Sequence, residues 1–446
     1  MRKETKARMA GKKMKADEKG GINLRAKTVD VPHSSASSDS PKKRIKVLVV
    51  FGTRPEVIKL APVIEALRQS AGPDAYATHR AASTSVAFEP VICFTGQHRE
   101  MVEPFLEIFD LKPDYDLHVM QENQPLAGLT ARLLVRLDKV LEAEAPDWVI
   151  VQGDTTTAMA ASLTAFYRRI KVGHVEAGLR TEDKYNPFPE EINRRLISHL
   201  ADLHFAPTPR ARENLLREGL DRRAILVTGN TVVDALHMIL KKTEEPGWSE
   251  KLKGKIKEIK AEDWNAGKSA APSPSRSAKL ILVTAHRRES FGGGMERICE
   301  AISRLVSLAP EAEVIFPVHL NPNVRSVVLR RLSGLERVHL VEPLDYLTFV
   351  YLMRQADLIL TDSGGIQEEA PSLGVPVIVM RDKTERPEAV EAGVAWLGGT
   401  DPEKIVRLAL TLLKKVESGE FRRSLKRRNP FGDGHAATRI IKRLGT

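Results

Sequence analysis

The run Val47-Leu48-Val49-Val50-Phe51, followed at once by Gly52-Thr53-Arg54-Pro55-Glu56, decides the fold of this chain. Five apolar residues in a row are typical of a strand that is buried on both faces of a parallel sheet. The glycine permits a tight turn after the strand, and a helix is expected to follow. The same unit of strand, turn and helix recurs along the chain, which predicts a parallel α/β sheet.

Two series of such units follow one another. The first has its clearest strands at residues 47–51, 90–94, 148–152, 172–175 and 203–207. The second begins with Lys279-Leu280-Ile281-Leu282-Val283-Thr284 and continues at residues 313–317, 337–341, 358–361, 375–380 and 394–397. The sequence therefore predicts an α/β protein of two Rossmann-like domains, residues 45–240 and 279–425. A ligand is expected in the cleft between them, at the carboxyl ends of the strands.

Composition separates other segments from these domains. Residues 246–278 contain a Lys-rich amphipathic piece and then Ala270-Ala271-Pro272-Ser273-Pro274-Ser275, which predicts a flexible insertion or linker. Residues 72–88, rich in Ala, Ser and Thr, are expected to form an enlarged loop. Residues 1–44 hold 13 Lys/Arg against 5 Asp/Glu and are expected to form a disordered basic tail.

The length, charge and cysteine content exclude several classes of protein. At 446 residues, 42% apolar, the chain is too long for one core and has ample material for two. Of the net charge of +11, +8 lies in residues 1–44, so the other 402 residues carry only +3 and no nucleic-acid partner is expected. No apolar run is long enough to span a membrane, and a cytoplasmic protein without a membrane partner is expected. Cys93 and Cys299 are expected to be buried thiols.

The first strand ends in residues suited to a phosphate. Arg54 and Lys59 bring positive charge to a helix N-terminus, which itself favours anions. An ordinary turn with a solvated arginine is the simpler alternative. The glycine pattern of dinucleotide-binding proteins, GxGxxG, is absent from this turn, which argues against a nicotinamide enzyme. No metal site is expected.

Carboxylates follow two neighbouring strands of the first series. Asp154 comes two residues after the end of strand 148–152, and Glu176 directly after strand 172–175. Strand ends of a parallel sheet converge on one edge, so both carboxylates are expected there, where they could act as acid and base. Glu190 and Glu191 begin a predicted helix, where an acidic pair is also explained by the helix dipole alone.

Strand ends of the second series add a histidine and an anion site. The segment Thr284-Ala285-His286-Arg287-Arg288-Glu289 places a histidine beside two arginines. In Asp362-Ser363-Gly364-Gly365-Ile366-Gln367-Glu368-Glu369, a serine and two glycines open a helix whose backbone N–H groups suit a diphosphate. From the residues alone, the chain is an enzyme or a binder of a nucleoside-diphosphate compound.

The motifs G-T-R-P-E, T-G-Q-H, Q-G-D-T, H-V-E-A-G-L-R-T, P-E-E-I-N-R, H-R-R-E, P-V-H-L-N-P and D-S-G-G-I-Q-E-E-A-P occur in this order from about residue 45 to 399. In this set and order the chain resembles the non-hydrolysing UDP-N-acetylglucosamine 2-epimerases. The resemblance implies a glycosyltransferase B-like fold, with a C-terminal helix in residues 426–446 that crosses back. It also implies a homodimer that interconverts UDP-N-acetylglucosamine and UDP-N-acetylmannosamine without a cofactor, by eliminating and re-adding UDP.

The resemblance also assigns roles. Acid/base function falls to Asp154, Glu176 and Glu190, and the diphosphate or leaving group to Arg54, Lys59 and His286. The nucleotide is expected to be held by Ser363, Gly364, Gly365, Glu369 and Arg386, with Phe349 available for stacking. Leu344 stands where related proteins often carry a glutamine that would contact uracil. Substrate activation would involve Gln97, His98, Arg287 and His319, although Gln97 and His98 could merely satisfy a loop.

Three alternatives remain open at this stage. An epimerase for a modified sugar, such as UDP-2,3-diacetamido-glucuronic acid, would share nearly all of these residues. A glycosyltransferase of the same fold would transfer the sugar to an acceptor instead. A nucleotide-sugar sensor would bind without turnover.

Overall fold

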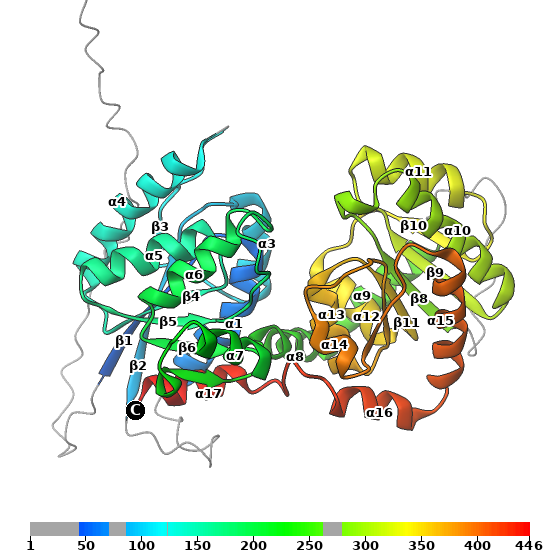
Figure 1. Ribbon diagram of the computed structural model, residues 1–446. Coiled ribbons are helices and arrows are strands. Elements are labelled where there is room, and N and C mark those ends of the chain that lie inside the picture. The colour runs from blue at the N-terminus through cyan, green and yellow to red at the C-terminus, as the bar shows by residue number, and fades with distance from the viewer. Residues whose placement is uncertain (1–43, 71–85, 123, 262–278) are drawn as a thin grey trace, which may run out of the picture.

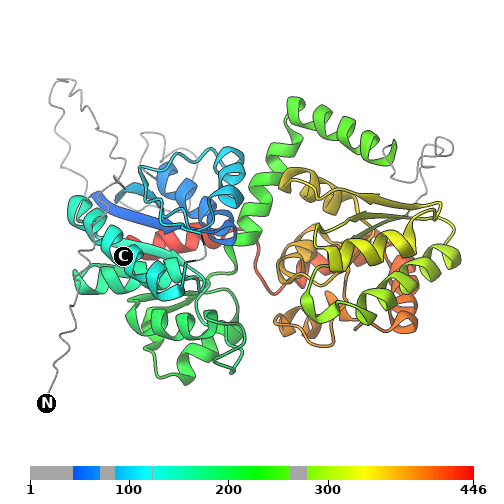
Figure 2. The same cartoon turned by 90° about the horizontal axis from the view of Figure 1, so that it is seen from above.

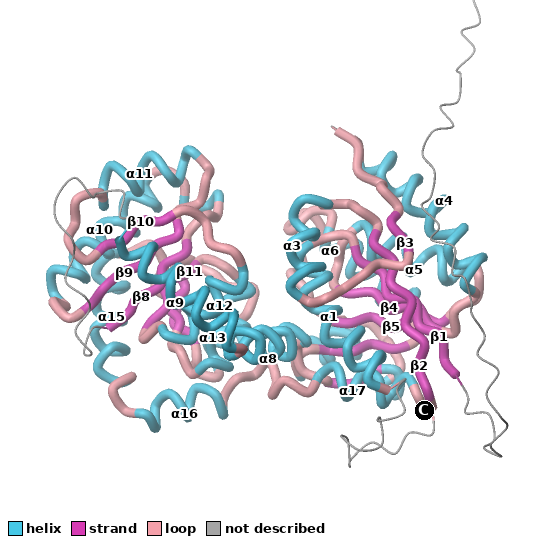
Figure 3. Tube along the Cα trace, turned by 180° about the vertical axis from the view of Figure 1, so that it is seen from behind, coloured by secondary structure: helices cyan, strands magenta, loops and turns pink. Residues whose placement is uncertain are grey.

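The computed structural model describes residues 44–70, 86–122, 124–261 and 279–446. Two parallel sheets, each covered by helices on both faces, stand side by side (Figures 1 and 3). The predicted fold class, two Rossmann-like α/β units, is therefore confirmed. The expected tail, apart from Arg44, and almost all of the loop at 72–88 lie outside the described residues.

Within the described part, seven parallel strands form the sheet of the N-terminal half in the order β3-β2-β1-β4-β5-β6-β7. They are β1 Arg44–Phe51, β2 Ala87–Phe94, β3 Tyr115–Asp116, β4 Trp148–Gln152, β5 Lys171–Val175, β6 Leu203–Ala206 and β7 Ile225–Val227. The strand order reverses between β1 and β4, which pair directly. Sequence patterns did not reveal β3 and β7 because both are short edge strands.

A second sheet, of six parallel strands in the residues the structure covers, organises the C-terminal half in the order β10-β9-β8-β11-β12-β13. Its strands are β8 Lys279–Thr284, β9 Ala312–Pro317, β10 Val338–Val341, β11 Leu358–Thr361, β12 Val377–Val379 and β13 Ala395–Leu397. The order reverses between β8 and β11. Each half thus has one point where ligands of doubly wound folds commonly bind.

The opening strand shows why this sequence forms a central strand. Val47, Val49 and Phe51 belong to one buried cluster, and Leu48 and Val50 belong to another on the opposite face of the sheet. All five are fully buried. A strand with helices on both faces needs apolar side chains at every position, and this run supplies them.

Helices cover both sheets. In the N-terminal half they are α1 Arg54–Gln69, α3 Arg99–Ile108, α4 Leu126–Glu144, α5 Thr156–Tyr167, α6 Glu190–Leu200, α7 Pro209–Arg217 and α8 Thr231–Glu244. The C-terminal half has α10 Gly293–Leu308, α11 Pro322–Leu332, α12 Tyr346–Gln355, α13 Gly364–Leu373, α14 Pro387–Glu391, α15 Pro402–Lys415 and α16 Gly419–Arg427. Helix α9 (Pro246–Ala261) precedes the second sheet, and α17 (Ala436–Leu444) ends the chain.

The chain crosses between the halves twice. Helix α8 runs from the N-terminal half to the C-terminal half, and the segment after α16 returns, so that α17 packs on α1 and α8 (Figures 1 and 2). The carboxylate of Asp234 in α8 accepts the backbone N–H groups of Ala436 and Ala437 at 3.2 and 2.9 Å. Those bonds fix the first turn of α17 beside α8.

The structure corrects part of the linker expected at 246–278. Residues Pro246–Ala261 form helix α9, which packs on α8 and α12. Leu252 is buried there, and Lys255 pairs with Asp345 of the segment before α12. Two glycines in this stretch disfavour a helix in isolation, but tertiary packing outweighs that preference. Residues 262–278 lie outside the described part.

Both cysteines are buried, as expected. None of the described helices has the length and the apolar run that crossing a bilayer requires. The cytoplasmic location stays a prediction.

Candidate active site

Several predicted site residues follow the strands at which the order of each sheet reverses. In the N-terminal half, Gly52 to Arg54 follow β1, and Gly153 and Asp154 follow its neighbour β4. In the C-terminal half, His286 follows β8, and Asp362 and Ser363 follow β11. Carboxyl ends of adjacent parallel strands meet at one edge, so the topology alone brings these turns together.

The turn after β1 is tightly packed. A Cβ atom on Gly52 would lie 2.2 Å from the Thr95 hydroxyl oxygen and 2.6 Å from that of Thr157, so only glycine fits. Glu56, fully buried, accepts the backbone N–H groups of Gly52 and Thr53 at 2.9 and 2.8 Å. Burial raises the pKa of Glu56 to about 7 despite these bonds.

Arg54 and Lys59 lie on the same helix in different surroundings. Arg54 is exposed, and its charge acts on Tyr346 and Glu369 of the other half. Lys59 is ion-paired with Glu176, and its Nζ lies 3.8 Å from Oε2 of Glu368. Burial disfavours the charge on Lys59, but these two carboxylates outweigh burial and raise its pKa.

Asp154 and Glu190 form a second acidic group. Arg194 donates to the Asp154 carboxylate at 2.8 Å, and Asn193 donates to the Asp154 backbone carbonyl at 2.9 Å. Burial, together with the negative charge of Asp154, raises the pKa of Glu190. Its Oε2 atom is buried and has no hydrogen-bond partner. Glu191, by contrast, is wholly buried and pairs with Arg194 at 3.1 Å, a structural role.

Glu176 is held by three donors. Lys59 and Gln152 each donate to one of its oxygens, and Asn230 donates at 3.0 Å. Its φ of 64° lies in the left-handed region, which costs a non-glycine residue about 1 kcal/mol. Burial acts to raise the pKa of Glu176, but Lys59 and Arg386 outweigh it, so the pKa is lowered. This side chain is therefore a fixed, ionised carboxylate.

A network of charges joins the two halves around Glu176. Glu368 of α13 is buried and accepts a hydrogen bond from Arg386 and another from Asn230 at 3.1 Å. Burial disfavours the Arg386 charge, but Glu368 outweighs burial and raises its pKa. Lys59, Glu176 and Asn230 come from the N-terminal half, whereas Glu368 and Arg386 come from the C-terminal half. The predicted residues Lys59, Glu176 and Arg386 are thus brought together.

His286 lies in a separate group on the C-terminal half. Its Nδ1 is 3.1 Å from Asp362, whose other oxygen accepts the backbone N–H groups of His286 and Arg287 at 2.6 and 2.7 Å. Burial acts to raise the pKa of Asp362, but these contacts outweigh it and lower the pKa. The His286 ring stacks on His319 with ring centroids 5.6 Å apart. The Nε atom of Arg287 is buried without a hydrogen-bond partner.

Helix α13 presents an open N-terminus beside this group. Ser363 is its N-cap residue, and a Cβ atom added to Gly364 or Gly365 would meet nothing within 4 Å. Neither glycine has a positive φ, so the backbone conformation does not require them. Open space above free helix N–H groups is what the close approach of an anion needs.

Glu369 and Phe349 are less accessible than the sequence suggested. Glu369 is buried and accepts a hydrogen bond from the Tyr346 hydroxyl at 2.7 Å. Burial raises its pKa to about 7. Phe349 is half-buried and packs against the main hydrophobic cluster, as does Leu344. Tyr346 also contacts Phe105 of α3 across the two halves, with ring centroids 5.4 Å apart.

The residues predicted for substrate activation occupy two places. Gln97 accepts a hydrogen bond from Thr157 at 2.7 Å, and the His98 backbone N–H donates to Gly52 at 2.9 Å. Both therefore lie against the turn after β1. Arg287 and His319 lie with His286 in the C-terminal half. Among the described residues, no hydrogen bond or ion pair joins these two places, nor Asp154 and Glu190 to His286.

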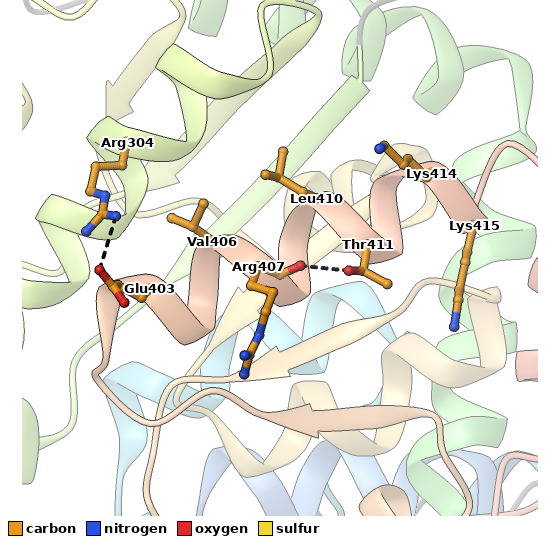
Figure 4. Close-up of a pocket in the computed structure, with 8 residues that line it drawn as sticks. All are labelled: Arg304, Glu403, Val406, Arg407, Leu410, Thr411, Lys414 and Lys415. Atoms are coloured by element: carbon orange, nitrogen blue, oxygen red, sulfur yellow. Dashed lines mark hydrogen bonds and ion pairs between the residues drawn. The ribbon is translucent and has the colours of Figure 1, made fainter.

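A groove elsewhere on the surface is not part of this site. It runs between α10 and α15 and is lined by Arg304, Glu403, Val406, Arg407, Leu410, Thr411, Lys414 and Lys415 (Figure 4). None of these residues follows a strand of either sheet, and the only ion pair drawn there is between Arg304 and Glu403. It has no part in the chemistry described above.

Sequence reasoning missed several residues of the site. Glu56, Asp362 and Glu368 stand within recognised motifs, and their burial was the missing information. Asn230 carried a weaker signal, as a polar residue between a strand and a helix. Nothing in the sequence showed that it contacts two carboxylates.

Comparison with known proteins agrees with this arrangement. The family described as UDP-N-acetylglucosamine 2-epimerase matches residues 80–445. The UDP-N-acetylglucosamine 2-epimerase of Yersinia pestis is 50% identical over 400 residues, which are 90% of this chain and 98% of that protein. The enzyme of the same name from Escherichia coli K12 is 48% identical over 400 residues, with the same coverage.

Solved structures give the same result. The UDP-GlcNAc 2-epimerase of Neisseria meningitidis bound to UDP-GlcNAc is 44% identical, with a TM-score of 0.73 over 90% of this chain and 99% of that one. The Methanocaldococcus jannaschii enzyme in complex with UDP-GlcNAc and UDP is 35% identical, with a TM-score of 0.67 and coverage of 90% and 99%. Since relatives match in sequence and in fold along nearly their whole length, this chain belongs to the UDP-N-acetylglucosamine 2-epimerase family.

Proposed function

We propose that this enzyme interconverts UDP-N-acetylglucosamine and UDP-N-acetylmannosamine by eliminating and re-adding UDP. The observation that carries the proposal is a pair of carboxyl groups, at one edge of the first sheet, whose pKa values shift in opposite directions. Lys59 and Arg386 lower the pKa of Glu176, whereas burial and Asp154 raise that of Glu190. Groups whose environments drive their pKa values apart suit the base and acid of one reaction.

The chemistry requires such a pair because the C2 proton of the sugar is not acidic. In the elimination, the anomeric C–O bond breaks, UDP leaves with its electron pair, and a base takes the C2 proton. The product is 2-acetamidoglucal, with a double bond between C1 and C2. In the return step a proton adds to C2 from the opposite face and a phosphate oxygen of UDP bonds to C1. Atoms and charge balance without an oxidant or a cofactor.

Asp154, Glu176 and Glu190 supply the proton transfers in this proposal. Glu176 is ionised, because Lys59 and Arg386 outweigh burial and lower its pKa, so it can take the C2 proton without first losing one of its own. Glu190 holds a proton more readily than an exposed glutamate and has a buried oxygen free to donate it. Asp154, fixed by Arg194, keeps Glu190 in that state through its charge.

The leaving diphosphate gains negative charge as the C–O bond breaks. Arg54, Lys59 and His286 meet that charge in the proposal, together with Ser363 and the backbone N–H groups of Gly364 and Gly365. Donors fixed in place before the reaction lower its barrier more than mobile ones. The open space above the two glycines supports this placement.

The nucleoside is assigned to the C-terminal half. Glu369, with Phe349 and Arg386, holds it in this proposal. Arg386 donates a hydrogen bond to Glu368, and Glu369 accepts one from the Tyr346 hydroxyl. Leu344 replaces a polar contact to the base by an apolar one.

A proton NMR time course of UDP-N-acetylglucosamine in deuterated water tests the function. UDP-N-acetylmannosamine should form while deuterium enters C2, because the removed proton exchanges with solvent. Turnover only with UDP-2,3-diacetamido-glucuronic acid would transfer the proposal to the modified sugar. Sugar transfer that depends on an added acceptor would support the glycosyltransferase, and binding without turnover the sensor.

A homodimer is part of the same proposal. Helices α4, α5 and α6 lie side by side on the N-terminal half (Figure 1). They expose large apolar side chains. These are Leu126, Val135, Phe166, Tyr167, Ile192 and Leu196. An apolar face of this kind fits a second copy of the chain. Light scattering should give twice the chain mass for the wild type and the chain mass for Phe166→Glu; a monomeric wild type would refute the dimer.

A further inference from the structure

Every polar atom of Asn230 is used in a contact. It is the N-cap residue of α8, and its Oδ1 accepts the Val232 backbone N–H at 3.1 Å. Its Nδ2 donates to Glu176 at 3.0 Å and to Glu368 at 3.1 Å. The side chain is almost completely buried. One amide group therefore bridges a carboxylate of the N-terminal half and a carboxylate of the C-terminal half.

The surroundings fix the orientation of this amide. Its nitrogen faces two carboxylates, which only accept hydrogen bonds, and its oxygen faces a backbone N–H, which only donates. A flipped amide would set an oxygen against both Glu176 and Glu368. Asn230 is consequently locked, and either carboxylate can keep its bond only while it stays in its present position.

Asn230 also lies where the chain crosses between the halves. Its backbone N–H donates to Phe431 at 2.7 Å, in the segment that returns to the N-terminal half. Beside it, a Cβ atom on Gly229 would lie 3.2 Å from the Cα atom of Gly432, so the outgoing and returning segments touch. A change in the relative position of the halves would displace Glu368 with respect to Asn230.

We propose that Asn230 is a positioning residue that couples the relative placement of the two halves to the orientation of the Glu176 carboxylate. This inference rests on the proposed function, in which Glu176 exchanges a proton with the substrate. When the halves adopt the arrangement seen here, Asn230 and Lys59 are each shared between Glu176 and Glu368. When Glu368 moves away, both shared groups are released to Glu176 alone, and the balance of charge around it changes.

The charges around Glu176 determine how a change at Asn230 would act. Lys59 comes from α1, Glu368 from α13 and Arg386 from the segment before α14, while neutral His174 lies beside it on β5. Loss of a hydrogen-bond donor to Glu176 would raise its pKa, because the ionised carboxylate would be stabilised less. A third carboxylate at position 230 would do so more strongly, because two cations would then face three anions.

Two substitutions separate bridging from helix capping. Asn230→Ser keeps an N-cap oxygen but is too short to reach both carboxylates, and Asn230→Asp keeps the shape and the cap but replaces the donor by an acceptor. Arg210→Ala is the matched control. It removes the exposed ion pair of Arg210 with Glu391, which also joins the halves at 2.5 Å but contacts no group of the site.

The experiment measures kcat, KM and the pH dependence of kcat/KM for UDP-N-acetylglucosamine, with thermal melts of each variant. Asn230→Ser should lower kcat about tenfold or more, the effect expected for a lost hydrogen bond to a charged group, while KM changes about threefold or less. The acid limb of the pH profile should move to higher pH. Asn230→Asp should enlarge both effects, and Arg210→Ala should stay within about twofold of the wild type.

Two results would overturn the inference. The first is that Asn230→Ser and Asn230→Asp both retain the kcat and the pH profile of the wild type. The second is that Arg210→Ala lowers kcat as much as the Asn230 variants do. If the melting temperature of Asn230→Ser is well below that of the wild type, the kinetics of Asn230→Asp, which keeps the helix cap, are used to test the inference. The wild-type reaction separately tests the proposed function, because a wild type that exchanges no C2 proton would refute that function, whereas active variants equal to the wild type refute this inference alone.

Discussion

The carboxylate of Glu56 accepts a hydrogen bond from the Thr155 hydroxyl at 2.5 Å, while its other oxygen accepts two backbone N–H groups of the turn after β1. Thr155 is the N-cap residue of α5 and directly follows Asp154. The bond therefore ties the turn that carries Arg54 to the turn that carries Asp154. Since burial raises the pKa of Glu56 to about 7, this tie has a consequence for stability at neutral pH.

Glu56→Gln should stabilise the protein at pH 8 and have much less effect at pH 5. Below about pH 4.5 the carboxyl is protonated in both the folded and the unfolded chain. Between 4.5 and about 7 it ionises in the unfolded chain first, so the folded state loses stability as pH rises. A shift of that size corresponds to at most about 3 kcal/mol.

Urea unfolding at the two pH values measures the effect. The glutamine can keep the contacts, because its oxygen accepts from Gly52 and Thr53 and its nitrogen donates to Thr155. Glu107→Gln, on the exposed side of α3, is the control and should leave the free energy of unfolding unchanged at both pH values. Equal changes in the free energy of unfolding for Glu56→Gln at pH 5 and pH 8 would contradict the prediction.

Asp154→Asn and Glu176→Gln should each cut turnover by about 10²-fold or more, the lower range for general acid/base groups. UDP affinity should fall much less, because the nucleoside is assigned to the other half. Steady-state rates and calorimetric titration with UDP measure the two effects. Asp183→Asn, in an exposed turn of the same half, serves as the control. Near-normal turnover in both variants would rule out the carboxylate assignment.

Two glycine substitutions should affect different properties, one the stability of the fold and the other the binding of UDP. Gly52→Ala should destabilise the fold by about 1–3 kcal/mol, since its methyl group would overlap Thr95 and Thr157. Gly364→Ala should leave the melting temperature unchanged, because that methyl group meets nothing within 4 Å, yet it should weaken UDP binding about tenfold by occupying the anion space. Melting curves and UDP titration of both variants check this, and unchanged UDP affinity in Gly364→Ala would place the diphosphate elsewhere.

The reaction started from UDP-N-acetylmannosamine alone should show a lag that a trace of UDP-N-acetylglucosamine removes. Activation of this kind requires a second ligand to favour one arrangement of the halves, with a typical coupling of about 1–3 kcal/mol, or roughly 5- to 150-fold in affinity. Gln97→Ala should abolish the activation and leave UDP binding intact. A wild type that shows no lag and a hyperbolic dependence of rate on substrate concentration would show that Gln97 only forms a hydrogen bond within its loop region, with Thr157.

Much of this molecule could be predicted from the sequence because its strands are buried on both faces. Val47 to Phe51 and Leu358 to Thr361 are continuous apolar runs, and only such runs suit a central parallel strand. Once the strands are placed, the residues that follow them must lie at one edge of each sheet. That is why Arg54, Asp154 and Glu176 could be placed in advance at one edge of the first sheet, and His286 and Ser363 at one edge of the second.

The tertiary structure alone decided which of those residues touch and which are ionised. Asn230 and Glu368 are 138 residues apart, and their contact exists only because α8 and the returning C-terminal segment set one sheet against the other. The helical state of Pro246–Ala261 depends in the same way on packing against α8 and α12. Local sequence fixes the strands and turns, but the pKa values of Glu176, Glu190 and Glu56 follow from burial and from neighbours distant in the chain, which only the packed fold brings together.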